Sequence, residues 1–146
     1  MLGTMTVRMM LLYIVEHHVD VALWGHHHTY QRSCPSLVNG TCTTAAQHKA
    51  QNQTQNGPMH LVIGMAGFKH DTDFIAPQPE PLWACADDAH YGFASLEFAN
   101  ATHMKGRFLD NWYGDTVDEW YLVRDPTQRA PNTVSDAGCR AWNMTR

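Results

Sequence analysis

Three consecutive histidines are the residues of this chain whose type and spacing are best suited to binding a metal ion. His26, His27 and His28 follow Gly25 at the end of an apolar run, residues 19–24. Neutral imidazole is the commonest side-chain ligand for metal ions. On an extended segment alternate side chains share a side, so we expect His26 and His28 to converge while His27 faces away. This spacing indicates a metal site, although an H-x-H pair by itself fits a surface loop as well.

The segments before the histidines predict a unit that could position them. Apolar residues recur at helical spacing over residues 4–18, which predicts a helix. The β-branched run 19–24 predicts a buried strand that stops at Gly25. Open α/β sheets place their chemistry at the carboxyl ends of strands. The histidines fall at such an end, and the fold class is predicted to be α/β (α+β).

Further strands are predicted downstream of a long polar loop. Residues 33–58 are rich in Ser, Thr, Asn, Gln and Gly and predict the loop. Residues 60–65 predict a strand, and residues 91–98 and 102–109 predict a strand pair joined by a turn at 100–101. Residues 119–123 predict one more strand. The last residues, 124–146, hold few apolar side chains and predict a loosely held tail.

Charge and hydropathy exclude some partners. The net charge is −4 and no Lys/Arg cluster occurs, so nucleic acid is not an expected partner. The apolar stretch 9–15 is too short to span a membrane. It also lacks the small-residue cleavage site of a signal peptide, so it is expected to be part of an internal helix. Met1 is therefore not expected to be where the full protein begins, and the sequence does not indicate an oligomeric state.

Four Asn-x-Ser/Thr sequons indicate a secretory-route glycoprotein, secreted or vacuolar. Their asparagines are Asn39, Asn52, Asn100 and Asn143. An oxidising compartment would permit disulfides, and C-x-x-C pairs are absent, which argues against a zinc finger.

Cys34 and Cys42 are the candidate disulfide pair, because the loop between them could close around the Asn39-Gly40 turn. Such a bond would contribute about 2–3 kcal/mol. Free thiols remain the alternative. Cys85 and Cys139 could also pair, but nothing in their local sequence supports it.

Two ordered blocks resemble the purple acid phosphatases, above all the larger plant-type enzymes. Residues 19–35 contain Gly-His-His-His-Thr-Tyr-Gln-Arg, which is similar to that family's G-H-x-H-x-Y-E-R segment. Residues 58–67, Pro-Met-His-Leu-Val-Ile-Gly-Met-Ala-Gly, resemble the strand that opens its C-terminal region. Tyr91-Gly92-Phe93 follows in the same order. The resemblance covers residues 7–123.

The resemblance implies the C-terminal part of a metallophosphoesterase β-sandwich flanked by helices. It divides the chain into the end of the catalytic domain (1–57), the family's C-terminal region (58–123) and a tail (124–146). It implies acid phosphatase chemistry, the hydrolysis of phosphate monoesters at a dinuclear centre of Fe(III) and a divalent Zn, Mn or Fe. His26 would bind the divalent metal and His28 the ferric ion, and no role carries over to His27.

The sequence departs from the family because it lacks the family's other metal-binding motifs. The family's other ligands lie in G-D-x-G, G-D-x-x-Y and G-N-H-[DE] motifs and an earlier histidine, and none of these occurs here. Two imidazoles cannot hold two metal ions, so this chain alone is expected to be inactive, with no catalytic residue of its own. Tyr30 is not the family's tyrosinate. Gln31 replaces a usual Glu, and Arg32 matches the family but fits a surface ion pair at least as well as a catalytic role.

Two other readings stay open. The chain could be a non-catalytic secreted glycoprotein on the same scaffold, although the retained His26 and His28 suit that reading poorly. It could also belong to another metallophosphoesterase branch, such as a nucleotide or phosphodiester hydrolase. The remaining histidines are expected to be structural: His17, His18, His48, His60, His70, His90 and His103.

Overall fold

The computed structural model describes residues 2–36, 58–71, 83–124 and 133–139. These ranges contain one helix, α1 (Leu2–Glu16), and eight strands. The strands are β1 (Val21–Trp24), β2 (Tyr30–Ser33), β3 (Met59–Ile63), β4 (Trp83–Asp87), β5 (Gly92–Phe98), β6 (His103–Asp110), β7 (Thr116–Val123) and β8 (Thr133–Cys139).

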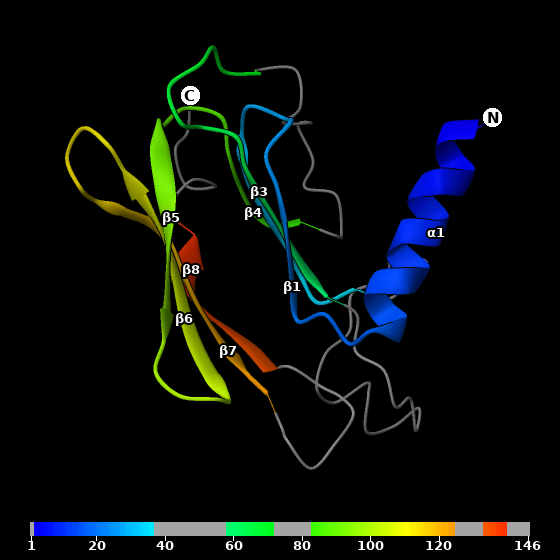
Figure 1. Cartoon of the computed structure of the whole chain (residues 1–146). Coiled ribbons are helices and arrows are strands. Elements are labelled where there is room, and N and C mark those ends of the chain that lie inside the picture. Colours follow the sequence, from blue (N-terminus) through cyan, green and yellow to red (C-terminus); the bar gives the residue numbers. More distant parts are fainter. Residues whose placement is uncertain (1, 37–57, 72–82, 125–132, 140–146) are drawn as a thin grey trace.

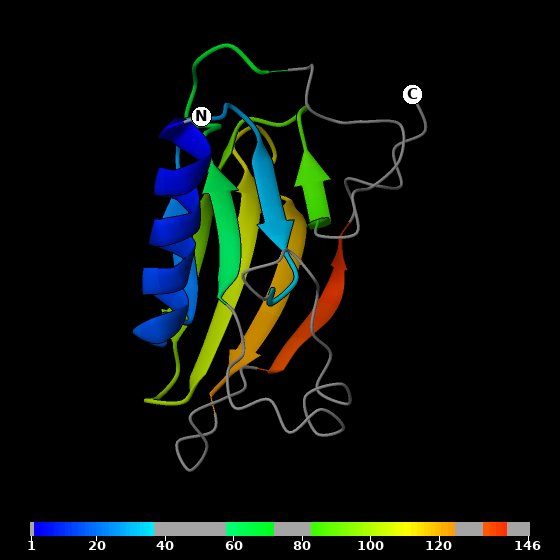
Figure 2. The same cartoon turned by 90° about the vertical axis from the view of Figure 1, so that its right-hand side faces the viewer.

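The strands form two four-stranded sheets that face each other (Figure 1). The first has the order β1-β3-β2-β4, in which β1 runs parallel to β3 and β2 runs antiparallel to both of its neighbours. The second is the antiparallel meander β5-β6-β7-β8. Helix α1 lies beside β1, on the side of the first sheet that faces away from the second (Figures 1 and 2). The described part of the chain is thus a β-sandwich with a helix on one flank.

The core fills the space between the sheets. Strand β6 shows strict alternation of buried and less buried positions, as expected of a strand with one face on a core. The centre is a stacked pair of rings, Tyr30 of β2 and Phe108 of β6, with centroids 4.2 Å apart and planes at 6°. Around it gather buried apolar side chains from both sheets: Met59, Leu61, Met65, Cys85, Met104, Val117, Trp120 and Leu122.

The predicted helix and the five predicted strand regions after it are confirmed, with shifted ends. Three strands were not predicted. Strand β2 reads Tyr-Gln-Arg-Ser, and its polar composition hides the fact that all four residues are buried. Strands β4 and β8 lack a clear alternation of apolar and polar residues. Because β8 pairs with β7, the stretch predicted to be a loose tail contributes a sheet strand.

The first sheet draws on both sides of the division expected at residue 57. Strands β1 and β2 precede that point and β3 and β4 follow it, yet β3 lies between β1 and β2. The division into three parts stays a prediction, but the two sides share one sheet.

Helix α1 ends in a turn that a left-handed residue closes. His18 has φ +54°, its N–H donates to the Val15 carbonyl, and the Val19 N–H donates to the Ile14 carbonyl, each at 3.1 Å. This is the hydrogen-bond pattern of a Schellman cap. His18 therefore ends the helix through its backbone conformation, which is a structural role.

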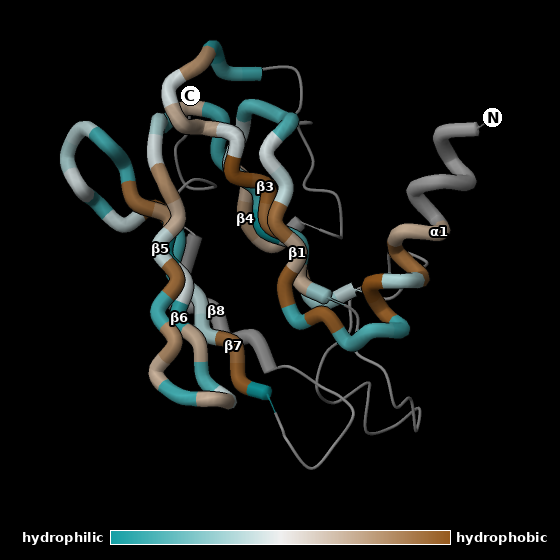
Figure 3. The backbone as a smooth tube through the Cα atoms, viewed as in Figure 1, coloured by the Kyte–Doolittle hydropathy of each residue, from teal (hydrophilic) through white to brown (hydrophobic). Residues whose placement is uncertain are grey.

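Several apolar side chains of α1 are exposed, including Met9 and Tyr13. In Figure 3 these apolar turns of α1 stand clear of both sheets. No helix in the described ranges is long and apolar enough to cross a membrane.

Candidate metal centre

The three histidines lie in the short loop between β1 and β2, at the carboxyl end of β1. The loop is bent and not extended, because the Thr29 N–H donates to the His27 carbonyl at 2.9 Å. Nδ1 of His27 lies 3.9 Å from Oδ2 of Asp71, and Nδ1 of His28 lies 3.7 Å from Oδ1 of the same residue. The expectation that His27 faces away from its neighbour is therefore wrong: the bend removes the alternation on which it depended.

The end of β3 supports this loop. A Cβ on Gly64 would lie 1.9 Å from the His27 carbonyl oxygen, so only glycine fits there. The Gly64 N–H also donates to the Thr29 carbonyl at 3.1 Å. Gly25, at the start of the loop, has no such constraint, because a Cβ there would have the Ile63 carbonyl oxygen as its nearest neighbour at 4.0 Å. The close approach that requires a glycine is at Gly64.

Asp71 contacts the histidine loop through both its side chain and its backbone N–H. Its carboxylate accepts the His28 backbone N–H at 2.9 Å, and its own N–H donates to the His28 carbonyl at 3.2 Å. The His28 N–H is the main reason that the pKa of Asp71 is lowered, with smaller contributions from the neighbouring imidazoles and a partial opposition from desolvation. Asp71 is an anionic partner of the loop that the sequence analysis missed, since only its place in space shows the role.

Gln31 reaches the same loop from β2. Its buried amide donates to the Thr29 hydroxyl at 2.6 Å, and that hydroxyl lies 3.1 Å from Nδ1 of His27. An uncharged amide can therefore hold the base of the histidine loop even though Gln31 replaces a carboxylate in the resembled motif.

Tyr30 and Arg32 face the core of the sandwich and not the loop. The Tyr30 hydroxyl donates to Oδ2 of Asp118 at 2.6 Å, and burial is the main reason that its pKa is raised well above the usual value. Arg32 binds both oxygens of Asp118, at 2.7 and 3.1 Å. A surface ion pair, one of the two readings left open for Arg32, does not describe this contact, since both partners are buried. These contacts agree with the prediction that Tyr30 is not a metal-binding tyrosinate.

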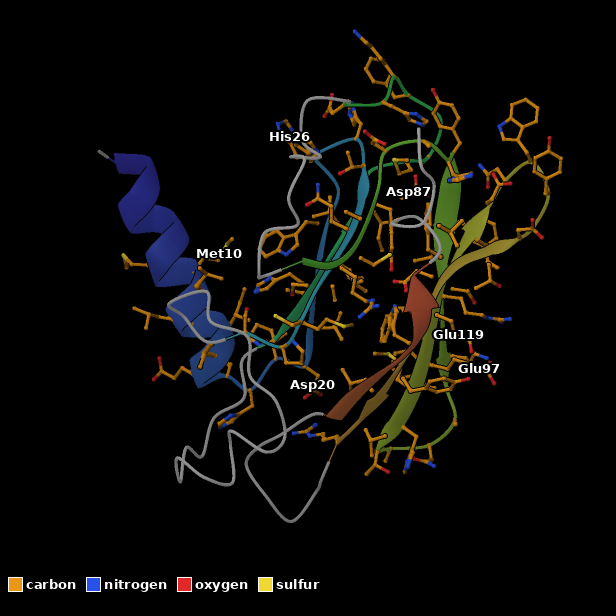
Figure 4. The ribbon with its side chains drawn as sticks, turned by 180° about the vertical axis from the view of Figure 1, so that it is seen from behind. Met10, Asp20, His26, Asp87, Glu97 and Glu119 are labelled. Carbon is orange, nitrogen blue, oxygen red and sulfur yellow. The ribbon has the colours of Figure 1, made fainter. Side chains whose placement is uncertain are left out.

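Other histidines and an acid lie near this end of the sandwich. Nδ1 of His90 lies 2.6 Å from Asp87, and the rings of His70 and Tyr91 lie 3.9 Å apart. Figure 4 shows His26 and Asp87 at the same end of the molecule, with Asp20 toward the other. His60 and His103 have structural partners, as expected: Trp24 donates to His60, and His103 contacts Asn100 and Thr102.

The donor chemistry of His26 and His28 fits a metal ion, but the described residues do not complete a centre. Within the described ranges no three His, Cys, Asp or Glu side chains group closely enough to hold an ion. Nδ1 of His28 faces the carboxylate of Asp71. The site is consistent with part of a ligand set.

The disulfide and glycosylation candidates fall partly inside the described residues. Cys34 and Cys85 are each disulfide-bonded. Cys42 lies outside the described residues, so the Cys34–Cys42 pair stays a prediction. Asn100 is exposed at the turn between β5 and β6, where its Oδ1 accepts the Thr102 N–H at 2.9 Å. Asn39, Asn52 and Asn143 also lie outside the described residues.

A cavity of about 330 Å³ opens at the far end from the histidines. It lies between the start of β1 and the β5–β6 turn, and its lining includes Leu23, Leu96 and Phe98. It contains none of the groups of the histidine loop, so we do not assign it to the candidate centre.

Comparisons with known proteins agree with this geometry. The family described as "Iron/zinc purple acid phosphatase-like protein C" matches residues 57–119. Acid phosphatase type 7 of Danio rerio is 30% identical over 108 residues, covering 73% of this chain and 24% of that protein. "Probable inactive purple acid phosphatase 9" of Arabidopsis thaliana is 46% identical over 114 residues, covering 72% of this chain and 16% of that protein.

A solved structure shares the fold. Purple acid phosphatase PPD1 of yellow lupin superposes with a TM-score of 0.64 at 23% identity, covering 78% of this chain and 19% of that one. The chain thus spans about a quarter or less of the length of these relatives.

The paired sheets with a histidine loop at one end define a sandwich of the metallophosphoesterase class. Within that class the chain is related to the purple acid phosphatases and corresponds to the C-terminal part of those proteins.

Proposed function

We propose that the protein containing this chain is an acid phosphatase that hydrolyses phosphate monoesters at a dinuclear centre of Fe(III) and a divalent Zn, Mn or Fe. In this proposal His26 binds the divalent metal and His28 the ferric ion. The observation that carries it is the histidine loop at the carboxyl end of β1, with Nδ1 of His28 turned toward Asp71. When bound, the metals supply Lewis-acid activation of water and of the ester.

The chain supplies only part of such a centre, so we expect the isolated 146-residue chain to be inactive. The first test is hydrolysis of an aryl phosphate by the purified chain supplied with Fe(III) and Zn²⁺. Turnover above that of a His26→Ala/His28→Ala double variant would contradict the proposal that further ligands are needed.

A longer form that carries the ligand motifs missing here provides the positive test. It should hold two metal ions per chain and hydrolyse the aryl phosphate, and His28→Ala should lower both the metal content and the rate. His27→Ala is the matched control, because no ligand role is assigned to His27.

A non-catalytic scaffold is the second candidate, because the relative with 46% identity is named as probably inactive. Metal analysis of the longer form separates the two candidates. Stoichiometric metal with turnover supports the phosphatase, and absence of metal supports the scaffold.

A third candidate rests on a barley relative named "Nucleotide pyrophosphatase/phosphodiesterase", which is 30% identical over 107 residues. Comparing a monoester with a diester of the same aryl alcohol distinguishes this branch. Faster hydrolysis of the diester would favour it over the acid phosphatase.

We also propose that the protein follows the secretory route, to the exterior or to a vacuole. The exposed position of Asn100 at a turn suits a glycan. Glycosidase treatment of the protein from its native source should lower its apparent mass, and Asn100→Gln should remove part of that shift.

A further inference from the structure

We propose that Asp71 is a positioning residue for the histidine loop, and that it holds the proton of His28 on Nδ1 so that Nε2 carries the lone pair. The inference deepens the proposed function, on which it rests where it names a metal as the partner of Nε2.

The backbone contacts between the two residues are reciprocal. The His28 N–H donates to Oδ2 of Asp71 at 2.9 Å, and the Asp71 N–H donates to the His28 carbonyl at 3.2 Å. These two bonds join positions 43 residues apart and fix His28 against the loop that follows β3. Asp71 therefore determines where the Cα of His28 lies.

The side-chain contact influences which ring nitrogen of His28 carries the proton. Oδ1 of Asp71 lies 3.7 Å from Nδ1 of His28, a distance at which the charge still attracts an N–H, though it is longer than a hydrogen bond. His27 is a weaker competitor, since its Nδ1 is 3.9 Å from Asp71 and 3.1 Å from the Thr29 hydroxyl. The edge of Phe68 contacts the His28 ring, with centroids 5.0 Å apart.

A carboxylate in this place has a chemical consequence. Metal-binding histidines generally donate their second ring N–H to a carboxylate or carbonyl, which sets the tautomer and raises the basicity of the ligating nitrogen. The contact with Asp71 biases His28 to the form with hydrogen on Nδ1. The segment 58–71 thereby supports the centre through Gly64 and Asp71 without providing any of the predicted metal ligands.

Nitrogen-15 NMR of histidine side chains tests the tautomer directly, with the 146-residue chain at a pH where the imidazoles are neutral. The His28 signals are identified by their loss in His28→Gln. We expect the wild-type His28 to show protonated Nδ1 and unprotonated Nε2, and Asp71→Asn to shift it toward the Nε2–H form that a neutral histidine side chain prefers in water. An Nε2–H tautomer in the wild type, or no change in Asp71→Asn, would overturn the proposal.

Hydrogen exchange separates the backbone role from the charge. Asp71→Asn keeps an oxygen that can accept the His28 N–H, whereas Asp71→Ala does not. We expect Asp71→Ala to accelerate exchange of the His28 amide at least about tenfold, and Asp71→Asn to restore most of the protection. Asp115→Asn, an exposed change elsewhere, should alter neither measurement. Equal exchange in wild type and Asp71→Ala would refute the anchoring role.

Zn²⁺ added to the longer form that carries the missing ligand motifs distinguishes failure of this inference from failure of the proposed function. A zinc-induced shift of the Nε2 signals of His26 and His28 supports both. If the tautomer is as expected but zinc moves neither signal, the positioning role stands and the metal assignment fails. If zinc binds with the tautomer unaffected by Asp71→Asn, the metal assignment stands and the role of Asp71 fails.

Discussion

Arg32 of β2 and Asp118 of β7 form a two-pronged ion pair across the interior of the sandwich, with both side chains almost wholly buried. The Tyr30 hydroxyl donates to the same carboxylate. Asp118 thus collects three hydrogen bonds from one strand of the opposite sheet. The pair connects β2, the strand that follows the histidine loop, to the second sheet.

Removing the charge of Asp118 should destabilise the fold. Asp118→Asn leaves the buried Arg32 cation without its anion, and such losses cost about 3–5 kcal/mol. Urea denaturation followed by tryptophan fluorescence measures the free energy of unfolding. Glu119→Gln is the matched control, because the neighbouring Glu119 pairs with Lys105 in a more exposed position and should matter little. Equal effects of the two changes would contradict the structural role.

Acid should weaken the fold through His60. Burial lowers the pKa of His60 below its usual 6.5, and Trp24 Nε1–H donates to its Nδ1 at 3.0 Å, which requires a neutral ring. The unfolded chain takes up the proton first as the pH falls. Stability is therefore full above 6.5 and is lost between that value and the lower pKa of the folded state.

The check is the free energy of unfolding as a function of pH in wild type and His60→Asn. Asparagine offers an acceptor in place of Nδ1 and does not titrate, so the variant should lose this part of the slope between pH 6.5 and the folded-state pKa. An unchanged slope would show that His60 does not contribute to it.

A methyl group at residue 64 should disturb the histidine loop. Gly64→Ala drives its Cβ into the His27 carbonyl, and overpacking of this kind costs about 1–3 kcal/mol. Gly25→Ala, at the start of the histidine loop, has room for the methyl group and should be tolerated. Thermal unfolding of both variants tests this, and a larger loss in Gly25→Ala would contradict the assigned contact.

A glycine at residue 18 should stabilise the end of α1. His18 holds a left-handed conformation that costs an ordinary residue about 1 kcal/mol, and glycine avoids most of that cost. His18→Gly should raise the free energy of unfolding by about 0.5–1 kcal/mol. His17→Gly should lower it instead, because His17 does not have a positive φ and its ring packs on Tyr13. Denaturant titration of the two variants compares them.

The elements that the sequence predicts well are those whose residues show their own periodicity. The helix before β1, the strands β1 and β3 and the β5–β6 pair all follow from apolar spacing or from a turn at residues 100–101. Strand β2 does not, because Gln31 and Arg32 look like surface residues until their buried partners are known. A polar strand can lie in a core only when distant residues satisfy it.

The sequence by itself determined the family relationship and the candidate ligands His26 and His28, because these depend on residue types at fixed spacing along the chain. Only the tertiary structure decided that the loop bends, that Asp71 and Gly64 hold it and that Arg32 faces the core. The contacts that Asp71 and Arg32 make join residues 43 and 86 positions apart. Local pattern carries no information about such contacts, since the packing of two sheets sets them.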